Sequence, residues 1–280
     1  MNKHFKAMAL GAALLTGLTA CASGGNGANN AVADDCKPKH EFSTIKEGVL
    51  TVALTNTPPY SFEENGKLAG IDSEILTDFA AQECLTVEYA PYTYATAVPA
   101  VEQGRVDVAI GGFYRTAARG EVVRLSEPVY LDELSVISKD GVSTVDGLLG
   151  KKLGTVEGYL WVDALKSLPG TETRTYPDSL NLAQDVKAGR IDIGLDGYGA
   201  AARSAEGTDF KVEVLEKDDR VPATVEPSQT SLLMNPGNDQ FGDALDETIV
   251  EMRETGRLVE ILENNGLPAS AAEVGDARLI

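Results

Sequence analysis

Residues 101–110 read VEQGRVDVAI, and residues 186–195 read VKAGRIDIGL. Each stretch joins the end of an amphipathic helix, through a glycine, to a strand of alternating polarity. Gly104 and Gly189 stand where a helix needs a left-handed residue to end. Because helix-period and strand-period segments also alternate along the rest of the chain, we expect an α/β fold. The repeated joint predicts two similar α/β lobes; chance similarity of the two stretches is the alternative.

The segments around the repeat extend the same alternation. The expected strands are Val49–Leu54, Cys84–Tyr89, Leu134–Ser138 and Thr230–Met234. The first helix is expected to begin at Asp72, whose carboxylate can cap the helix N-terminus. Two more helices are expected after the last strand, and residues 271–280 look like a loose tail.

The composition of the 280 residues excludes several classes of function. A formal net charge of −19 at pH 7 disfavours nucleic acid and anionic lipid headgroups as partners. The chain has two histidines, His4 and His40, which excludes a histidine-rich metal site and an HExxH motif. We therefore expect neither a metal nor a cofactor.

The N-terminus has the pattern of an export signal. Lys3 and Lys6 precede an apolar run at residues 7–15 that is too short to span a membrane. The next segment, Leu-Thr-Ala-Cys ending at Cys21, resembles the lipobox of bacterial lipoproteins, in which the cysteine receives a diacylglycerol. We expect a lipoprotein signal peptide at 1–20, a lipid anchor at Cys21 and a flexible tether at 21–36. An ordinary signal peptide with an incidental cysteine is the alternative.

Two cysteines remain after the anchor. An exported protein meets an oxidising environment, so Cys36 and Cys84 are expected to form a disulfide. That bond would attach the N-terminal extension to the end of the first helix. Two buried free thiols are the alternative.

An ordered set of short motifs between Gly48 and Pro268 carries a family resemblance. The motifs are PPYSF at 58–62, GKLAGID at 66–72, AVPAVEQGRVD at 97–107, GFYRTAAR at 112–119, LSEPVY at 125–130, LGTVEG at 153–158, GRID at 189–192 and GRL at 256–258. In this order they resemble the bacterial extracytoplasmic solute-binding proteins, family 3, which capture polar amino acids for ABC transporters. The resemblance implies a type II periplasmic-binding-protein fold, with two α/β lobes joined by two hinge strands. Lobe 1 is placed at 37–137 plus 229–270, lobe 2 at 138–228, and a tail at 271–280.

The resemblance also assigns polar residues of the binding site. In the family, an arginine in the position of Arg119 grips the carboxylate of the ligand, and guanidinium suits a carboxylate because it binds with two parallel hydrogen bonds. An acid in the position of Asp196 holds the α-ammonium group. Gly112 is placed to donate its N–H to the ligand carboxylate, and Asn56 falls near a position that is commonly acidic. Surface or capping roles are the alternatives for Arg119 and Asp196, and Arg115 is expected on the surface.

Aromatic residues are expected around the same cleft. They are Tyr60, Tyr94, Phe113, Tyr114 and Tyr159, with Trp161 close by. Such rings suit a flat or cationic side chain of the ligand. Packing of some of these rings inside the lobes is the alternative. Glu157 near the cleft would favour a cationic group of the ligand, or it is simply solvated.

The resemblance implies a non-enzymatic receptor, anchored outside the cytoplasm by Cys21. It would capture an amino acid or related amine by closing its lobes and pass it to the membrane subunits of an ABC importer. A monomer is expected, with the lipid anchor as its sole contact with the membrane. Two alternatives stay open. One is an enzyme similar to cyclohexadienyl or arogenate dehydratases, with Glu157 or Asp196 as general acid. The other is a sensory or scaffolding module.

Overall fold

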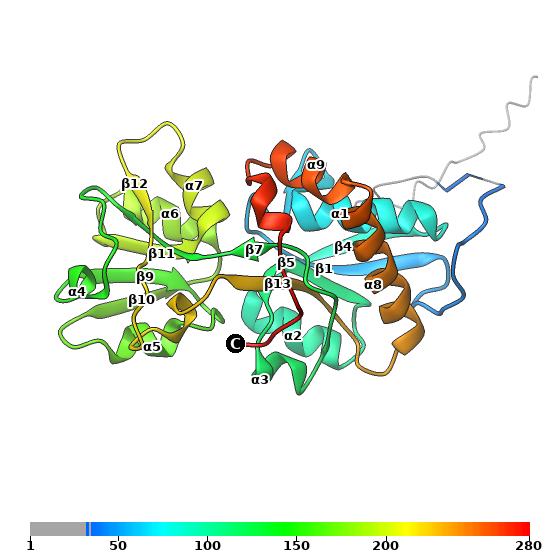
Figure 1. Ribbon diagram of the computed structural model, residues 1–280, viewed down its shortest axis with the longest axis horizontal. Coiled ribbons are helices and arrows are strands. Elements are labelled where there is room, and N and C mark those ends of the chain that lie inside the picture. Colours follow the sequence, from blue (N-terminus) through cyan, green and yellow to red (C-terminus); the bar gives the residue numbers. More distant parts are fainter. Residues whose placement is uncertain (1–31, 34) are drawn as a thin grey trace, which may run out of the picture.

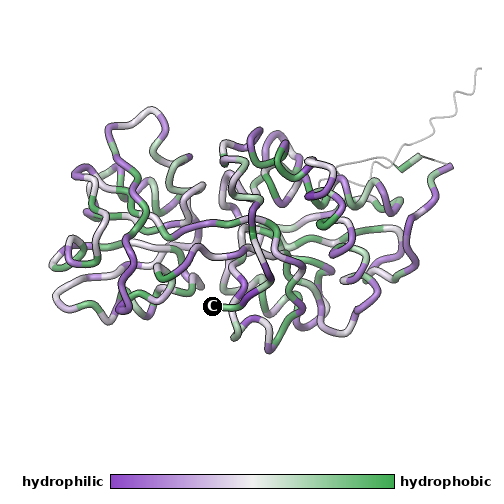
Figure 2. The backbone as a smooth tube through the Cα atoms, in the orientation of Figure 1, coloured by the Kyte–Doolittle hydropathy of each residue, from purple (hydrophilic) through white to green (hydrophobic). Residues whose placement is uncertain are grey.

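The structure is a computed structural model that describes residues 32–33 and 35–280. The expected signal peptide, Cys21 and most of the tether lie outside the described residues. Two α/β lobes lie side by side along the long axis of the molecule and are joined by two extended crossings (Figure 1). The tube in Figure 2 is most hydrophobic along the strands inside each lobe and most hydrophilic in the outer loops. Among the described residues, no helix is both long and apolar enough to cross a membrane.

Lobe 1 is built on the sheet β4-β1-β5-β13-β6, with β7 paired to β13. Its strands are β1 (Val49–Thr55), β4 (Thr86–Tyr92), β5 (Val108–Tyr114), β6 (Arg124–Leu125), β7 (Leu131–Asp132) and β13 (Ser228–Met234), with the hairpin β2 (Phe62–Glu64) and β3 (Lys67–Ala69) beside them. Its helices are α1 (Ile71–Gln82), α2 (Tyr94–Glu102), α3 (Ala117–Gly120), α8 (Asp239–Glu254) and α9 (Arg257–Asn264). The core on one face of the sheet is shared with α1, α8 and α9, and α2 packs against the other face.

Lobe 2 is built on the sheet β10-β9-β11-β8-β12. Its strands are β8 (Leu134–Ser138), β9 (Lys152–Val156), β10 (Glu172–Tyr176), β11 (Ile193–Gly197) and β12 (Lys211–Val214). Its helices are α4 (Val145–Leu148), α5 (Val162–Ser167), α6 (Ser179–Lys187) and α7 (Tyr198–Ala205), followed by the short 3-10 turn η1 (Pro222–Thr224). Strand β8 was expected at the end of lobe 1. It pairs with β11 and β12 instead, so the first crossing lies before Leu134.

The repeated joint has the same backbone form in both lobes. Gly104 after α2 and Gly189 after α6 are both left-handed, with φ of 63° and 66°. Beyond each glycine an aspartate stands directly before the next strand, and its carboxylate accepts a backbone N–H from the neighbouring strand. Asp107 binds Thr51 in this way and Asp192 binds Lys152, each at 2.8 Å. The prediction of two similar helix–glycine–strand joints is therefore confirmed.

Asp72 does not cap α1, contrary to expectation. The N-cap is Gly70, at φ 98°, and Asp72 lies in the first helical turn. Its buried carboxylate crosses to β5 and accepts the N–H groups of Gly111 at 2.9 Å and Gly112 at 2.8 Å, and it accepts the hydroxyl of Tyr130 at 3.0 Å. The side chain therefore fixes β5 against α1 instead of ending the helix.

Residues 271–280 are not a loose tail. After the short turn η2 (Ala269–Ala272), the side-chain amide of Gln229 donates to the carbonyls of Val274 and Asp276. Ile280 exchanges backbone hydrogen bonds with Arg115 and Ala117. The segment therefore runs along the start of β13, close to the junction of the lobes (Figure 1).

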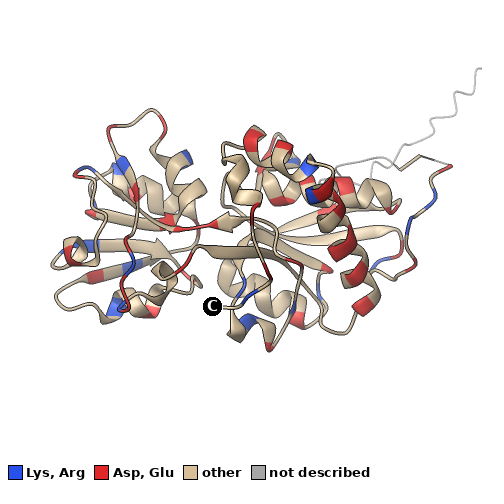
Figure 3. Ribbon diagram, viewed as in Figure 1, with Lys and Arg blue, Asp and Glu red and all other residues tan. Residues whose placement is uncertain are grey.

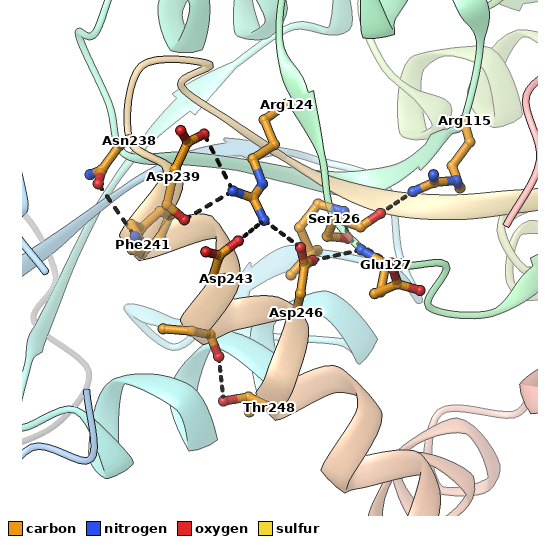
Figure 4. A network of polar contacts seen from close by, with 12 residues as sticks. Arg115, Arg124, Ser126, Glu127, Asn238, Asp239, Phe241, Asp243, Asp246 and Thr248 are labelled. Atoms are coloured by element: carbon orange, nitrogen blue, oxygen red, sulfur yellow. Dashed lines mark hydrogen bonds and ion pairs between the residues drawn. The ribbon is translucent and has the colours of Figure 1, made fainter. Parts of the chain in front are cut away.

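Two further attachments hold the outside of lobe 1. The expected disulfide Cys36–Cys84 is present and ties the N-terminal segment to the end of α1. On another helix of this lobe, acidic residues gather along α8 (Figure 3). Arg124 of β6 binds three of these acids, Asp239, Asp243 and Asp246, and so attaches the helix to the sheet edge (Figure 4).

Candidate ligand-binding site

A cavity of about 290 Å³ of empty space, partly open to solvent, lies between the two lobes. Its lining residues are Tyr60, Tyr94, Gly112, Tyr114, Arg119, Asp132, Tyr159, Leu160, Trp161 and Gly197. Both lobes contribute to the wall, so a ligand held here would contact both.

Arg119 supplies the cation of the cavity. The hydroxyl of Thr116 accepts the Arg119 N–H and caps the short helix α3 that carries it. The guanidinium donates to the carbonyl of Tyr114 at 2.7 Å and of Gly158 at 3.5 Å, and it lies 5.2 Å from the ring centre of Phe113. Among the described residues no carboxylate lies within ion-pair distance of it. Burial lowers the pKa of Arg119 to about 10, so it stays charged at neutral pH without a counterion.

Asp132 is an acid of the cavity that the sequence analysis did not identify. It ends β7, at the first crossing between the lobes, and is 3 % exposed. Its Oδ2 accepts the hydroxyl of Tyr114 at 2.7 Å, whereas its Oδ1 has no hydrogen-bond partner. Burial raises the pKa of Asp132 to about 6, although hydrogen bonds from Tyr114 and Tyr60 oppose the shift. Its position in a crossing segment, rather than in a recognisable motif, left no signal in the sequence.

Asp196, the expected ammonium ligand, lies one residue behind the wall. It is fully buried near the end of β11, and the next residue, Gly197, lines the cavity. Its Oδ1 accepts the hydroxyl of Tyr159 and the N–H of Gly197, both at 2.9 Å, and its Oδ2 has no partner. Burial raises the pKa of Asp196 to about 7, and the charge of Asp132 adds to this shift.

Aromatic rings from both lobes meet around the cavity. Tyr94 of lobe 1 packs edge-on against Tyr159 of lobe 2, with 4.7 Å between ring centres. Tyr114 and Trp161 make a second contact between lobes, at 5.7 Å. The hydroxyl of Tyr60 accepts the N–H of Gly199 across the cleft at 2.8 Å. These contacts describe the lobes in a closed arrangement.

Several expected site residues have other positions. Phe113 is fully buried, packs 4.8 Å from the ring centre of Tyr94, and supports Arg119 from behind. Gly112 lines the cavity, but its N–H donates to Asp72 and not into the cavity, which corrects its expected role. Asn56 and Glu157 are not among the lining residues.

Arg115 was expected on the surface. It is half-buried, and its guanidinium donates to the carbonyl of Ser126 (Figure 4). It is not a lining residue of the cavity, so Arg119 is the arginine that faces the ligand space.

Comparison with known proteins identifies the family. The model of the bacterial extracellular solute-binding proteins, family 3, matches residues 50–266. The chain is 26% identical to the L-cystine-binding protein TcyJ of Escherichia coli (strain K12), over 79% of this chain and 84% of that protein. It is 24% identical to a probable histidine-binding protein of Campylobacter jejuni, over 56% of this chain and 63% of that protein.

Solved structures agree in fold. An ancestral arginine-binding protein bound to arginine has a TM-score of 0.69 and 25% identity, over 79% of this chain and 99% of that one. The substrate-binding protein of an amino acid ABC transporter has a TM-score of 0.70 and 24% identity, over 78% of this chain and 99% of that one. With its two-lobed fold and the family model matching most of its length, this chain belongs to the bacterial extracellular solute-binding proteins, family 3.

Proposed function

We propose that this protein captures an α-amino acid between its lobes and delivers it to the membrane subunits of an ABC importer. The observation that carries the proposal is the pairing of an uncompensated cation and an unsatisfied anion in one cavity. Arg119 has no acidic partner among the described residues, whereas Asp132 in the lining and Asp196 directly behind it each have a buried oxygen without a hydrogen bond. Buried polar groups are normally satisfied, so a zwitterion would complement the charges at this cavity.

The two ends of an amino acid have matching partners in this arrangement. The carboxylate would bind the guanidinium of Arg119, which can offer two parallel hydrogen bonds. The α-ammonium would bind a carboxylate of the opposite wall, for which the family resemblance points to Asp196. Because these partners lie on different lobes, the ligand would stabilise the closed arrangement over an open one. Relatives named as cystine-, histidine- and arginine-binding proteins support an amino acid as the ligand class.

The location and anchoring of the protein belong to the same proposal. The lipobox-like residues that end at Cys21 support a lipid anchor outside the cytoplasm, and a disulfide at Cys36–Cys84 suits that oxidising location. We propose a monomer whose contact with the membrane is the anchor. We propose lobe boundaries on the same basis: the segment assigned to lobe 2 at 138–228 is extended to begin before Leu134, because β8 pairs within that sheet.

Isothermal titration of the purified protein with a panel of α-amino acids tests this function. At least one amino acid should bind, and Arg119→Ala should weaken its binding by about 2–5 kcal/mol, because the ligand carboxylate would lose its cation. Arg105→Ala is the matched control, since it removes the same charge from an exposed position of lobe 1. Equal losses in the two variants would show that Arg119 acts through net charge alone, and unchanged affinity in Arg119→Ala would reject the assignment.

We propose further that the protein is a receptor without catalytic activity. A buried acid with a pKa near 7 is a property that a dehydratase could use, and Asp196 has it. Glu157 is exposed and is not among the lining residues, so it is not placed as a general acid, and we assign Asp196 to the α-ammonium group of the ligand instead of to a proton transfer. An absorbance assay with prephenate and arogenate tests this point, and turnover that is lost in Asp196→Asn would contradict it.

A further inference from the structure

The charges around the cavity do not balance for a simple zwitterion. Arg119 is the only Arg or Lys among the lining residues. Two buried acids lie at the cavity, Asp132 in its lining and Asp196 directly behind Gly197. Each has one oxygen without a hydrogen-bond partner, Oδ1 of Asp132 and Oδ2 of Asp196. An amino acid with an uncharged side chain would satisfy the guanidinium and one of these acids. The other acid would stay unpaired, which is costly for a buried charge.

The local structure keeps space for the Asp132 carboxylate. A Cβ atom at Gly197 would lie 2.3 Å from its Oδ2, so the wall at this point accommodates the carboxylate because residue 197 has no side chain. The hydroxyl of Tyr114 holds the same oxygen at 2.7 Å. Asp132 also borders an open groove that contains Glu133, but its side chain is almost fully buried, so solvent does not satisfy the free oxygen.

We propose that the ligand carries a cationic side chain in addition to its α-ammonium group, and that Asp132 binds this second cation. This inference rests on the proposed function and refines it to the class of basic amino acids. Asp196 then serves the α-ammonium, so each orphaned carboxylate oxygen receives a partner. The ligand contributes two cations and one anion, which complement one guanidinium and two carboxylates.

The remaining lining residues fit the same ligand class. The rings of Tyr60, Tyr94, Tyr114, Tyr159 and Trp161 offer apolar faces to an alkyl stem and attract a cation through their electron-rich faces. A ligand with two carboxylates, such as cystine, would need a second cationic partner, and the lining residues include none. The charges of the lining residues therefore disfavour cystine as the ligand of this chain.

Pairs of ligands that differ in one charge test the inference. L-arginine and L-citrulline have nearly the same shape, as do L-lysine and L-norleucine, and the second member of each pair lacks the side-chain cation. Titration calorimetry should give an affinity for the charged member of at least one pair that is about tenfold or more above its neutral partner. In Asp132→Asn this ratio should fall towards one, because the charged member loses the partner of its side-chain cation. In Asp196→Asn both members should weaken together.

The control is Glu133→Gln, which removes one negative charge next to Asp132 but outside the ligand cavity. It should leave the ratio unchanged, and thermal melts should show that each variant is folded. A neutral member that binds as tightly as its charged partner overturns the inference, as does an Asp132→Asn variant that weakens both members equally. Binding of other α-amino acids alone overturns the inference and leaves the proposed function intact. Absence of binding by every amino acid overturns both.

Discussion

The two copies of the helix–glycine–strand joint share a scaffold, and one strand position beyond it carries a charge in one copy only. In both, a left-handed glycine ends the helix, and an aspartate binds the neighbouring strand through its carboxylate. When the copies are aligned, Gly111 in β5 corresponds to Asp196 in β11. In lobe 1, this position is a glycine whose N–H binds an acid from α1. In lobe 2, the residue at this position is itself the acid.

This difference shows how a repeated scaffold supplies opposite charges to one cleft. In lobe 1 the acid Asp72 comes from α1 and is satisfied by three donors, so it serves the fold. The chain then continues through β5 to Arg119, the cation of the cavity. In lobe 2 the acid Asp196 keeps one free oxygen beside the cavity wall. The scaffold sets the position on the strand, and the residue at that position separates the structural role of Gly111 from the ligand-binding role that we propose for Asp196.

The largest effect is expected when the glycine of β5 at this position is changed. Gly111 has φ 145°, and a Cβ there would lie 1.6 Å from Oγ1 of Thr55 within the same lobe. Gly111→Ala should therefore lower the free energy of unfolding by about 3 kcal/mol through backbone strain and overpacking. Urea denaturation measures it. Gly120→Ala is the control because its Cβ would meet only an ordinary contact at 3.7 Å, and equal stability of the two variants would contradict the argument.

The two joint aspartates should differ in strength. Asp107 is buried and accepts the N–H groups of Ile45 and Thr51, whereas Asp192 is exposed and accepts one N–H, from Lys152. Asp107→Ala should cost about 2 kcal/mol because it strands buried donors, and Asp192→Ala about 0.5–1 kcal/mol because water replaces the lost acceptor. Denaturant titrations measure the loss of stability in the two variants. A larger loss in Asp192→Ala than in Asp107→Ala would contradict the argument from burial.

The sequence predicts the scaffold better than the site. Each joint is formed by residues that are close in sequence, so the hydrophobic periodicity and the glycine in one short stretch of chain are enough to predict it. The roles of Asp72 and Asp132 are not local. Nothing near Asp72 in sequence shows that its carboxylate binds Gly111 and Gly112 instead of its own helix.

Asp132 was missed for the same reason. It faces the cavity because β7 crosses between lobes at that residue, whereas the family resemblance placed the crossing after residue 137. Arg119 was identified through the family motif in which it stands, and its position in the cavity agrees with that expectation. Residues in motifs were thus recoverable, and residues placed by the meeting of the lobes were not.

The residue after the aligned position is a glycine in both lobes. A substitution of this glycine in lobe 2 should weaken ligand binding without lowering the stability of the protein. In lobe 1 this glycine is Gly112, and in lobe 2 it is Gly197. A Cβ atom at Gly197 would lie 2.3 Å from Oδ2 of Asp132 and 2.9 Å from the hydroxyl oxygen of Tyr60, both across the cleft. Gly197→Ala should therefore oppose closure and weaken ligand binding by about tenfold, with little change in the stability of the ligand-free protein. Calorimetry and urea denaturation together measure this. A loss of stability as large as that of Gly111→Ala would place the clash inside lobe 2 instead.

The pH dependence of stability should distinguish Asp72, which binds the N–H of Gly111 in lobe 1, from Asp196, which occupies the aligned position in lobe 2. Burial raises the pKa of Asp72 to about 6, with its backbone donors opposing the shift, and raises that of Asp196 to about 7, from an ordinary value of 3.8. Between pH 4 and these values the folded chain binds protons that the unfolded chain has released. Stability therefore falls as the pH rises, by at most about 1.4 kcal/mol per pH unit for each acid.

From pH 6 to pH 7 Asp196 contributes the largest share of any single acid, because Asp72 and Asp132 are already about half ionised at pH 6 and mostly ionised at pH 7. His40 adds a slope of the same sign there, since Glu83 and Glu247 raise its pKa against the lowering effect of burial. The test therefore compares two proteins. Urea denaturation of the ligand-free protein and of its Asp196→Asn variant gives the change in unfolding free energy between pH 6 and pH 7 for each. The variant should lose part of the slope in this interval and also below pH 6, where the folded chain keeps the Asp196 proton that the unfolded chain has released. An unchanged slope would mean that Asp196 is ionised in the folded protein, and its free oxygen would then need a cation even before a ligand arrives.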